Sequence, residues 1–390
     1  MLWLVFLAVS CPGRNSHAFV PLPRTACCVG TNDVLLSRPQ QQQQQQHQQQ
    51  SIIITPPPVP PRPMAASSGA SSSFEQRSAS YQGQTYTYVY KPAATTTASK
   101  QAPPLRVSRL FPSARTTTTT TTLLLIHPVG IGLCNWFWEK LLMETRMDDC
   151  EIYSLNLLGC CSGMIASTNA TTTTTTTYPG EYPWAEQIYE LLTETIRRPV
   201  VLVTQGACAP LASQVTCILR QQQRQQLVSH VVLSSPPPTS PTVDPGLFSF
   251  LTSSPWGSFA FDLLETVPSI RLFSNLFLFD RPCDNTWTAN CIREADPNVR
   301  RPVAYTNAGY VRDTTTSATT MITSTRAGAI PTLVLRGAKD PRRDSSSEQQ
   351  QQNTTTFRRI PQAKNVVAWE QPAALAQAIL EFVDDNKSRT

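Results

Sequence analysis

The sequence predicts an α/β protein built on a doubly wound, mostly parallel β-sheet. Short runs of apolar and β-branched residues recur along the chain, and such runs suit strands that are covered on both faces. The predicted strands are 85–90, 123–127, 151–158, 199–204, 229–235, 330–337 and 364–369. Helix-like segments with apolar residues at the i, i+3, i+4 spacing, such as 182–197 and 372–385, lie between or after them. Alternation of strand and helix is typical of a doubly wound sheet.

The composition supports one sizeable core and several tracts outside it. Hydrophobic residues make up 40% of the 390 residues, whereas charged residues make up 15%, against about 25% in an ordinary globular domain. Runs of Gln and Thr cause this dilution, and a wholly disordered chain is excluded. Because long loops cost little stability, these tracts are predicted to lie in surface loops. They are 116–122, 171–177, 221–226, 314–316 and 345–356.

Charge and cysteine usage exclude several classes of partner. The net charge is +6 (32 basic minus 26 acidic residues), and the basic residues are scattered, so nucleic acid is not a predicted partner. The longest apolar run, 1–9, is about half of the ~20 residues that a membrane-spanning helix requires. Eleven cysteines without a CxxC pair indicate free thiols in a reducing compartment. No metal site and no cofactor is predicted.

The first eighty residues read as leader and linker. Residues 1–18 are predicted to be a signal peptide and 19–38 a transit peptide. The transit peptide contains two basic residues, Arg24 and Arg38, and one acidic residue, Asp33. The stretch SHAFVP (16–21) resembles the Ala-Phe-x-Pro cleavage motif of two-part plastid leaders in diatoms and related algae. This resemblance implies a plastid location, with the secretory pathway as the alternative. Residues 39–80 are predicted to be a disordered Gln/Pro/Ser-rich linker.

Four motifs in the segment 81–390 resemble landmarks of the α/β-hydrolase superfamily, and they occur in the family's order. The run 126–142 is similar to the His-Gly segment after the third strand, with Pro128 in place of the first glycine, and 155–163 to a Gly-rich turn, with Asn156 in place of Asp. The run 330–340 resembles the strand that ends in Gly-x-x-Asp, and 369–383 the last helix. The resemblance implies an α/β-hydrolase fold with a helical cap inserted at about 236–329.

The catalytic positions of the family are changed in this chain. Aligning 201–212 (VLVTQGACAPLA) with the family's nucleophile turn puts Gly206 at the apex of the elbow, where a serine is usual. Glycine tolerates the strained apex conformation but offers no nucleophile. Asn365 stands where the family has its histidine, whereas Asp340 matches the triad acid. The resemblance therefore implies a domain without a Ser-His-Asp mechanism.

A ligand pocket is predicted beside the elbow. His127 corresponds to the family's His-Gly histidine and is expected to organise the loop rather than to transfer protons. Backbone N–H groups near Val129 and Ala207 are expected to form an anion-binding pair. The other histidine of the domain, His230, is expected at the surface or at the sheet edge. The predicted function is binding of a small apolar or carboxylated ligand, or of a partner protein.

The alternative is an active hydrolase of esters or related small substrates. A shift of two residues makes 206–210 (GACAP) similar to the cysteine elbow of dienelactone-type hydrolases, with Cys208 as nucleophile, and a water positioned by Asp340 is a further route. A helix N-terminus favours a thiolate, although a cysteine at such a position is more often a buried packing residue. The cap aromatics are predicted to form mainly the core of the cap. They are Phe248, Phe250, Trp256, Phe259, Phe261, Phe273, Phe277 and Phe279.

Overall fold

The computed structural model describes residues 74–94, 120–161, 182–237, 243–311, 330–341 and 355–387, which belong to one compact unit, 68–390. The predicted signal peptide, the predicted transit peptide and the linker up to residue 73 lie outside these ranges. Of the Gln and Thr tracts, 221–226 is described in full, and it is an exposed turn as predicted.

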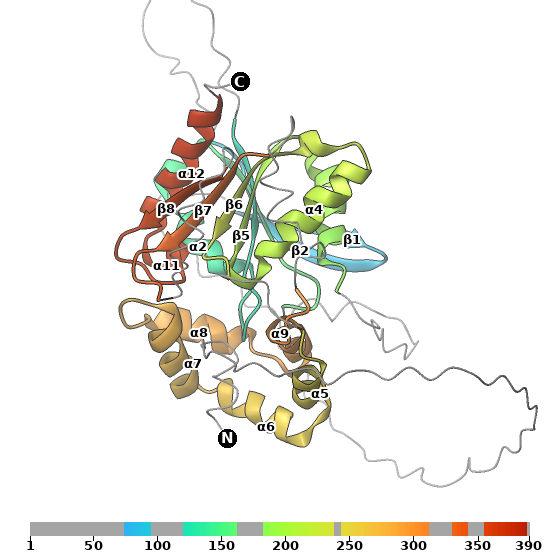
Figure 1. The fold of residues 1–390 in the computed structure, drawn as a ribbon, viewed down its shortest axis with the longest axis vertical. Helices are drawn as coiled ribbons and strands as arrows, with labels where there is room; N and C mark the ends of the chain where they lie inside the picture. The colour runs from blue at the N-terminus through green and yellow to red at the C-terminus, as the bar shows by residue number, and fades with distance from the viewer. Residues whose placement is uncertain are drawn as a thin grey trace, which may run out of the picture. The chain divides into compact units, whose positions relative to one another are not determined.

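Eight strands form one sheet in the order β1-β2-β4-β3-β5-β6-β7-β8 (Figure 1). The pairs β1/β2 and β2/β4 are antiparallel, and the other five pairs are parallel. This confirms the predicted doubly wound, mostly parallel sheet. The strands are β1 (Glu75–Tyr81), β2 (Gln84–Lys91), β3 (Thr122–Ile126), β4 (Glu151–Leu155), β5 (Val200–Gln205), β6 (Val228–Ser234), β7 (Thr332–Gly337) and β8 (Thr355–Ile360).

Helices cover both faces of the sheet, so the central strands are buried throughout. Every residue of β3, β4 and β5 is buried, which explains the apolar runs LLLI in β3 and VVLV in β5. One face carries α3 (Trp184–Glu190), continued by a π-helical turn (Leu191–Ile196), and α4 (Ala209–Gln221). The other face carries α2 (Glu139–Leu142), α11 (Val367–Glu370) and α12 (Pro372–Lys387). Short 3-10 turns are η1 (Asn135–Trp138), η2 (Thr145–Met147), η5 (Gly206–Cys208), η6 (Gln225–Leu227) and η8 (Pro297–Val299).

A helical cap is inserted between β6 and β7, as the sequence predicts. Three of its helices begin at a residue whose side chain accepts a backbone N–H of the first turn: Asp244 from Leu247 (2.9 Å), Ser254 from Trp256 (3.2 Å) and Asp284 from Trp287 (2.7 Å). The cap helices are α5 (Pro245–Ser253), α6 (Pro255–Leu264), α7 (Val267–Phe273) with the π-helical turn η7 (Ser274–Leu278), α8 (Asn285–Glu294) and α9 (Arg300–Asn307).

Two predicted boundaries are corrected. The first strand begins at Glu75, so residues 75–80 belong to the sheet and not to the predicted linker. The predicted strand 364–369 is wrong: this segment is a turn followed by α11, and the last strand is β8, which begins within the last two residues of the predicted tract 345–356 and extends beyond it. Because β8 is the edge strand of the described sheet and pairs there with β7 alone, it tolerates the polar sequence TTFRRI and shows no apolar run.

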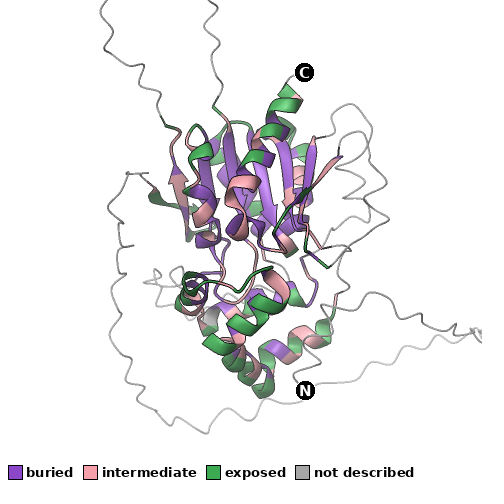
Figure 2. Ribbon diagram, turned by 90° about the vertical axis from the view of Figure 1, so that its left-hand side faces the viewer, coloured by how far each residue is buried: buried purple, intermediate pink, exposed green. Residues whose placement is uncertain are grey.

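Three tryptophan rings join the cap to the sheet. Trp136 in η1, Trp287 in α8 and Trp369 in α11 pack edge to face, with ring centroids 5.2–5.4 Å apart. The prediction that the cap aromatics form its core is only partly correct. Phe261 and Phe279 are buried, but Trp256 is 63% and Phe259 60% exposed, on helices that are exposed over much of their surface in Figure 2.

Candidate functional site

The carboxyl ends of the parallel strands meet at the edge of the sheet that faces the cap, which is where open α/β sheets bind ligands (Figure 1). The loop after β3 closes on the cap here. A Cβ added to Gly132 would lie 1.9 Å from the backbone oxygen of Cys291 in α8. The predicted site residues follow β3, β5 and β7 or precede α11, so they come from four separate segments.

Gly206 forms the apex of the turn between β5 and α4. Its φ is +59°, in the left-handed region that glycine adopts with the least strain. The space beside it is open: the nearest atom to an added Cβ is Pro128 Cβ, at 3.9 Å. The structure therefore has the strained turn predicted for an elbow apex, without a side chain on it. Ala207, the next residue, is exposed.

His127 is fully buried and holds two loops together. Its Nε2 accepts a hydrogen bond from the Leu157 backbone N–H (3.1 Å), and its Nδ1 lies 2.9 Å from the Pro128 carbonyl oxygen. Because an N–H needs an unprotonated acceptor, the proton of the neutral ring is on Nδ1 and is donated to Pro128. Burial lowers the pKa of His127 to about 4, and the Pro128 carbonyl opposes this shift. The side chain thus links the loop after β3 to the loop after β4.

Cys208 is fully buried two residues after the apex. Burial raises the pKa of its thiol to about 12, although a hydrogen bond from the Val129 backbone N–H works in the opposite direction. The thiol is therefore protonated at neutral pH. The same hydrogen bond places Val129 against the elbow. Because the Val129 N–H donates to the Cys208 sulfur, one of the two donors of the predicted anion-binding pair is already in use.

The loop that carries Asn365 lies beside the elbow, and the turn after β7 contacts the same loop. Gln205, the last residue of β5, donates from Nε2 to the Asn365 backbone oxygen (2.8 Å). The turn after β7 rests on the same loop, since the Lys339 backbone N–H donates to the Ala363 oxygen (2.9 Å). Asp340, in that turn, is buried, and its backbone N–H donates to the Gly337 oxygen (3.1 Å). The structure thus places Asn365 beside the elbow, and the residue before Asp340 contacts the chain two residues before Asn365.

Several polar residues at this edge were not predicted. Gln205, Ser234 and Ser235 are buried, and Gln205 Oε1, Ser234 Oγ, Ser235 Oγ and Asn365 Oδ1 have no hydrogen-bond partner among the described residues. Gln205 and Ser234 are register partners on neighbouring strands, so their side chains share one face of the sheet. The sequence gives one sign of these residues: they are polar and stand at the ends of apolar strands. A buried polar atom without a partner is costly.

His230 does not belong to this edge. It lies near the start of β6, packs edge to face on Phe382 of α12 (5.5 Å between centroids) and contacts Ser229 Oγ (3.0 Å). It is buried, so its predicted surface position is wrong. In the described ranges, no group of three or more His, Cys, Asp or Glu is arranged to hold a metal ion. No helix within them is long and apolar enough to cross a membrane.

No protein-family profile and no curated protein sequence matches the chain. Solved structures do resemble it. A meta-cleavage product hydrolase from Pseudomonas fluorescens superposes with a TM-score of 0.54 at 14% identity, over 80% of this chain and 98% of that one. A putative lipase from Acinetobacter baumannii gives 0.54 at 12% identity, over 82% and 94%. An epoxide hydrolase gives 0.52 at 13% identity, over 80% and 99%.

These similarities establish the fold of the protein. The sheet, the covering helices and the inserted cap form an α/β-hydrolase fold, and the fold prediction is confirmed. At such low identity the likeness extends to the fold and not to the chemistry of the neighbours.

Proposed function

We propose that this hydrolase-like protein does not hydrolyse but binds a small apolar or carboxylated molecule, or a partner protein, at the carboxyl edge of the sheet. The observation that carries the proposal is Gly206. The turn has the left-handed backbone of an elbow apex, yet its apex residue has no hydroxyl or thiol that could attack a substrate.

The lack of a suitable base supports the same conclusion. Of the two histidines in the described residues, His127 uses both ring nitrogens to hold loops and His230 lies near the start of β6. Asn365 stands in the loop before α11, beside Gln205, but an amide has no lone pair that takes up a proton at neutral pH. Asp340 alone cannot replace the missing members of the triad.

The polar atoms at the elbow support binding. The Asn365 backbone oxygen can only accept, so the Gln205 amide must turn its nitrogen to it, and Oε1 remains as a buried acceptor without a partner in the part of the chain that the structure describes. The hydroxyl groups of Ser234 and Ser235 are also buried and have no hydrogen-bond partner among the described residues. A bound molecule or an ordered water that satisfies these atoms would recover the free energy that their burial costs.

The alternative, a hydrolase with Cys208 as nucleophile, finds less support. A nucleophilic cysteine is accessible and has a lowered pKa, whereas Cys208 is fully buried and the pKa of its thiol is raised to about 12. We therefore keep this alternative only as an outcome of the experiment.

The test is turnover of a panel of short and medium-chain p-nitrophenyl esters by the full chain. We expect the wild type to match the buffer blank and Gly206→Ser/Asn365→His to gain measurable activity, because Pro128 leaves room for a side chain at the apex. Gly206→Ala/Asn365→His is the matched control: it carries the same backbone strain without a hydroxyl and should stay inactive. The wild type should bind a dansyl-labelled medium-chain carboxylate without consuming it.

Two results would contradict the proposal. Turnover by the wild type that is lost in Cys208→Ala would identify a cysteine hydrolase. Turnover that survives Cys208→Ala but is lost in Asp340→Asn would identify a reaction on a water held by Asp340.

The plastid location is part of the proposal and rests on residues 1–38 alone. We expect a fluorescent protein fused behind residues 1–38 to accumulate in the plastid of a diatom cell. Secretion of the fusion into the medium would support the secretory alternative.

A further inference from the structure

The cap carries most of the large apolar side chains that the described part of the molecule exposes. Seven of the eight lie on α6, α7 and η7, and the eighth, Met143, follows α2. We call the seven the cap patch. They are Trp256, Phe259, Leu263, Val267, Leu272, Phe273 and Leu276, and their exposed fractions run from 36% to 63%.

The cap patch exists because its helices are apolar on more than one side. A surface helix normally buries one apolar stripe and turns polar residues outward. Helix α6 buries only Gly257 and Phe261, and α7 buries only Ile270, although both consist mainly of apolar residues. Trp256 and Phe259 pack edge to face on α6, with ring centroids 6.4 Å apart, and exposed apolar surface of this kind marks an interaction site.

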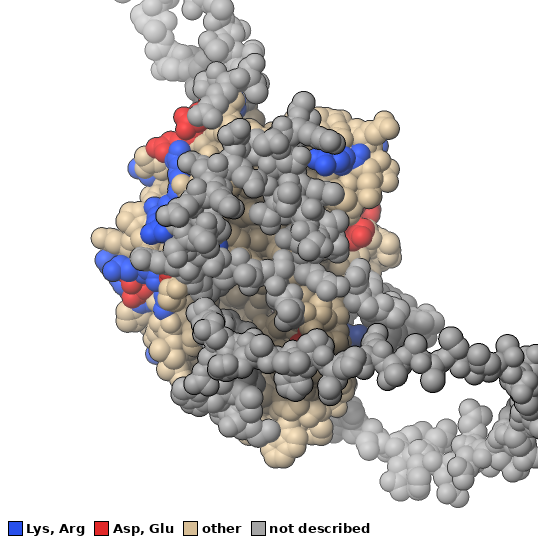
Figure 3. Space-filling model, viewed as in Figure 1, with Lys and Arg blue, Asp and Glu red and all other residues tan. Residues whose placement is uncertain are grey.

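The charges around the cap patch indicate which kind of partner it can bind. No charged residue occurs from 247 to 261. Both acids of α6 and its end, Asp262 and Glu265, form ion pairs with Arg300. Arg271, between the exposed Val267 and Leu272, contacts Asn285 and has no carboxylate partner among the described residues. In Figure 3 the lower edge of the molecule, over α6, shows no charged side chain.

We propose that the cap patch docks on the surface of a phospholipid bilayer. Trp and Phe side chains favour the boundary between head groups and acyl chains, and an exposed guanidinium complements the phosphates of the head groups. Helices α6 and α7 have ten and seven residues, so they lie on the membrane rather than span it. A protein partner fits less well, since protein interfaces have a polar rim with hydrogen bonds.

The experiment is flotation of the full chain with phosphatidylcholine vesicles, and with vesicles that also contain phosphatidylserine. We expect the wild type to float with both. Trp256→Ser/Phe259→Ser should lower the partition coefficient about tenfold or more, because each ring loses its apolar burial in the bilayer. Arg271→Gln should lower it about fivefold on the vesicles with phosphatidylserine. Met143→Ser is the matched control, an exposed apolar residue outside the cap, and should bind like the wild type.

Thermal unfolding and light scattering complete the test. The changed residues are exposed, so all variants should melt within a few degrees of the wild type. The proposal would be overturned if the wild type did not float with either kind of vesicle. It would also be overturned by a concentration-dependent dimer that Trp256→Ser/Phe259→Ser converts to monomer while vesicle binding is unchanged, since the partner would then be a second copy of the chain.

Discussion

At the scale of single residues, burial decides the chemistry of the candidate site. His127 and Cys208 are reactive residue types that follow β3 and β5 at the carboxyl edge of the sheet, yet both side chains are fully buried. Burial lowers the pKa of His127 to about 4 and raises the pKa of Cys208 to about 12. Both groups are therefore neutral at pH 7, and their contacts are with the backbone of the β3 and β4 loops.

The lowered pKa of His127 predicts a pH dependence of stability. Below the ordinary pKa of 6.5 the unfolded chain takes up a proton that the folded chain does not take up until about pH 4. The unfolding free energy should therefore fall as the pH falls from 6.5 to 4, by about 3 kcal/mol from this residue. Urea unfolding of the wild type and of His127→Gln at several pH values measures it. If the unfolding free energy of His127→Gln fell with pH as steeply as that of the wild type between pH 6.5 and 4, His127 would not be the cause of the fall.

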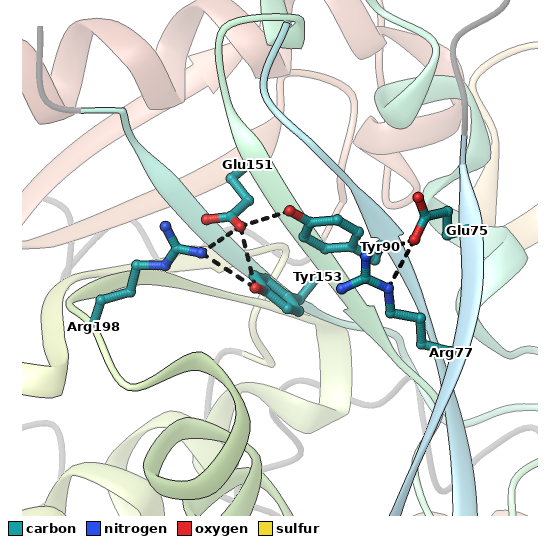
Figure 4. A network of polar contacts seen from close by, with 6 residues as sticks. All are labelled: Glu75, Arg77, Tyr90, Glu151, Tyr153 and Arg198. Atoms are coloured by element: carbon teal, nitrogen blue, oxygen red, sulfur yellow. Dashed lines mark hydrogen bonds and ion pairs between the residues drawn. The ribbon is translucent and has the colours of Figure 1, made fainter. Parts of the chain in front are cut away.

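At the scale of elements, a polar network at the amino end of β4 joins three strands (Figure 4). The buried Glu151 carboxylate accepts from Tyr90 (2.9 Å), Tyr153 (3.2 Å) and Thr122 (3.2 Å), and it pairs with Arg198. On β1, Arg77 stacks over the Tyr90 ring at 3.8 Å. Both carboxylate oxygens of Glu151 accept hydrogen bonds, so the network ties the neighbouring strands together.

Removal of Glu151 should destabilise the sheet strongly. Glu151→Ala leaves three hydroxyl groups without their acceptor, and we expect a loss of about 2–4 kcal/mol in the free energy of unfolding. The control is Glu75→Ala, which breaks an ion pair with Arg77 that is about half exposed and should cost less than about 1 kcal/mol. Urea unfolding measures both. Equal losses in the two variants would show that burial of the carboxylate is not the cause.

At the scale of the whole molecule, the cap packs tightly against the sheet and its helices at one joint between them. Trp136, Trp287 and Trp369 pack together there, and the Trp369 indole N–H donates to Asp284 (3.0 Å) at the start of α8. Glu370 accepts from the backbone N–H of Asp280 (2.6 Å) and of Lys364 (2.8 Å), so one side chain holds the cap to the loop that carries Asn365.

The tight contact at Gly132 predicts a glycine requirement in this joint. Gly132→Ala puts a Cβ 1.9 Å from the Cys291 oxygen at a φ of +64°, and we expect it to cost about 2 kcal/mol or more, because backbone must move. Gly83→Ala is the matched control: its φ is +78° but nothing lies within 4 Å, so only the strain of about 1 kcal/mol remains. Thermal unfolding of both variants decides whether the contact or the strain dominates.

Part of the candidate site was predictable and part was not. The apex at Gly206 was predicted because the small residues of a strand-to-helix turn are consecutive in the sequence. Gln205, Ser234 and Ser235 were not predicted, since their importance arises from the meeting of β5, β6 and the loop before α11. The helix at 367–370 was mistaken for a strand because a short buried apolar run looks the same in either conformation.

The sequence by itself determined the alternation of strands and helices, the place of the cap and the glycine at the elbow, because these depend on periodicity and on residues adjacent in the chain. Only the tertiary structure decided that Cys208 and His127 are sealed from solvent, that Asn365 reaches the elbow and that Trp256 and Phe259 face outward. Burial depends on which distant segments pack against a residue. A residue's own neighbours in the sequence carry no such information.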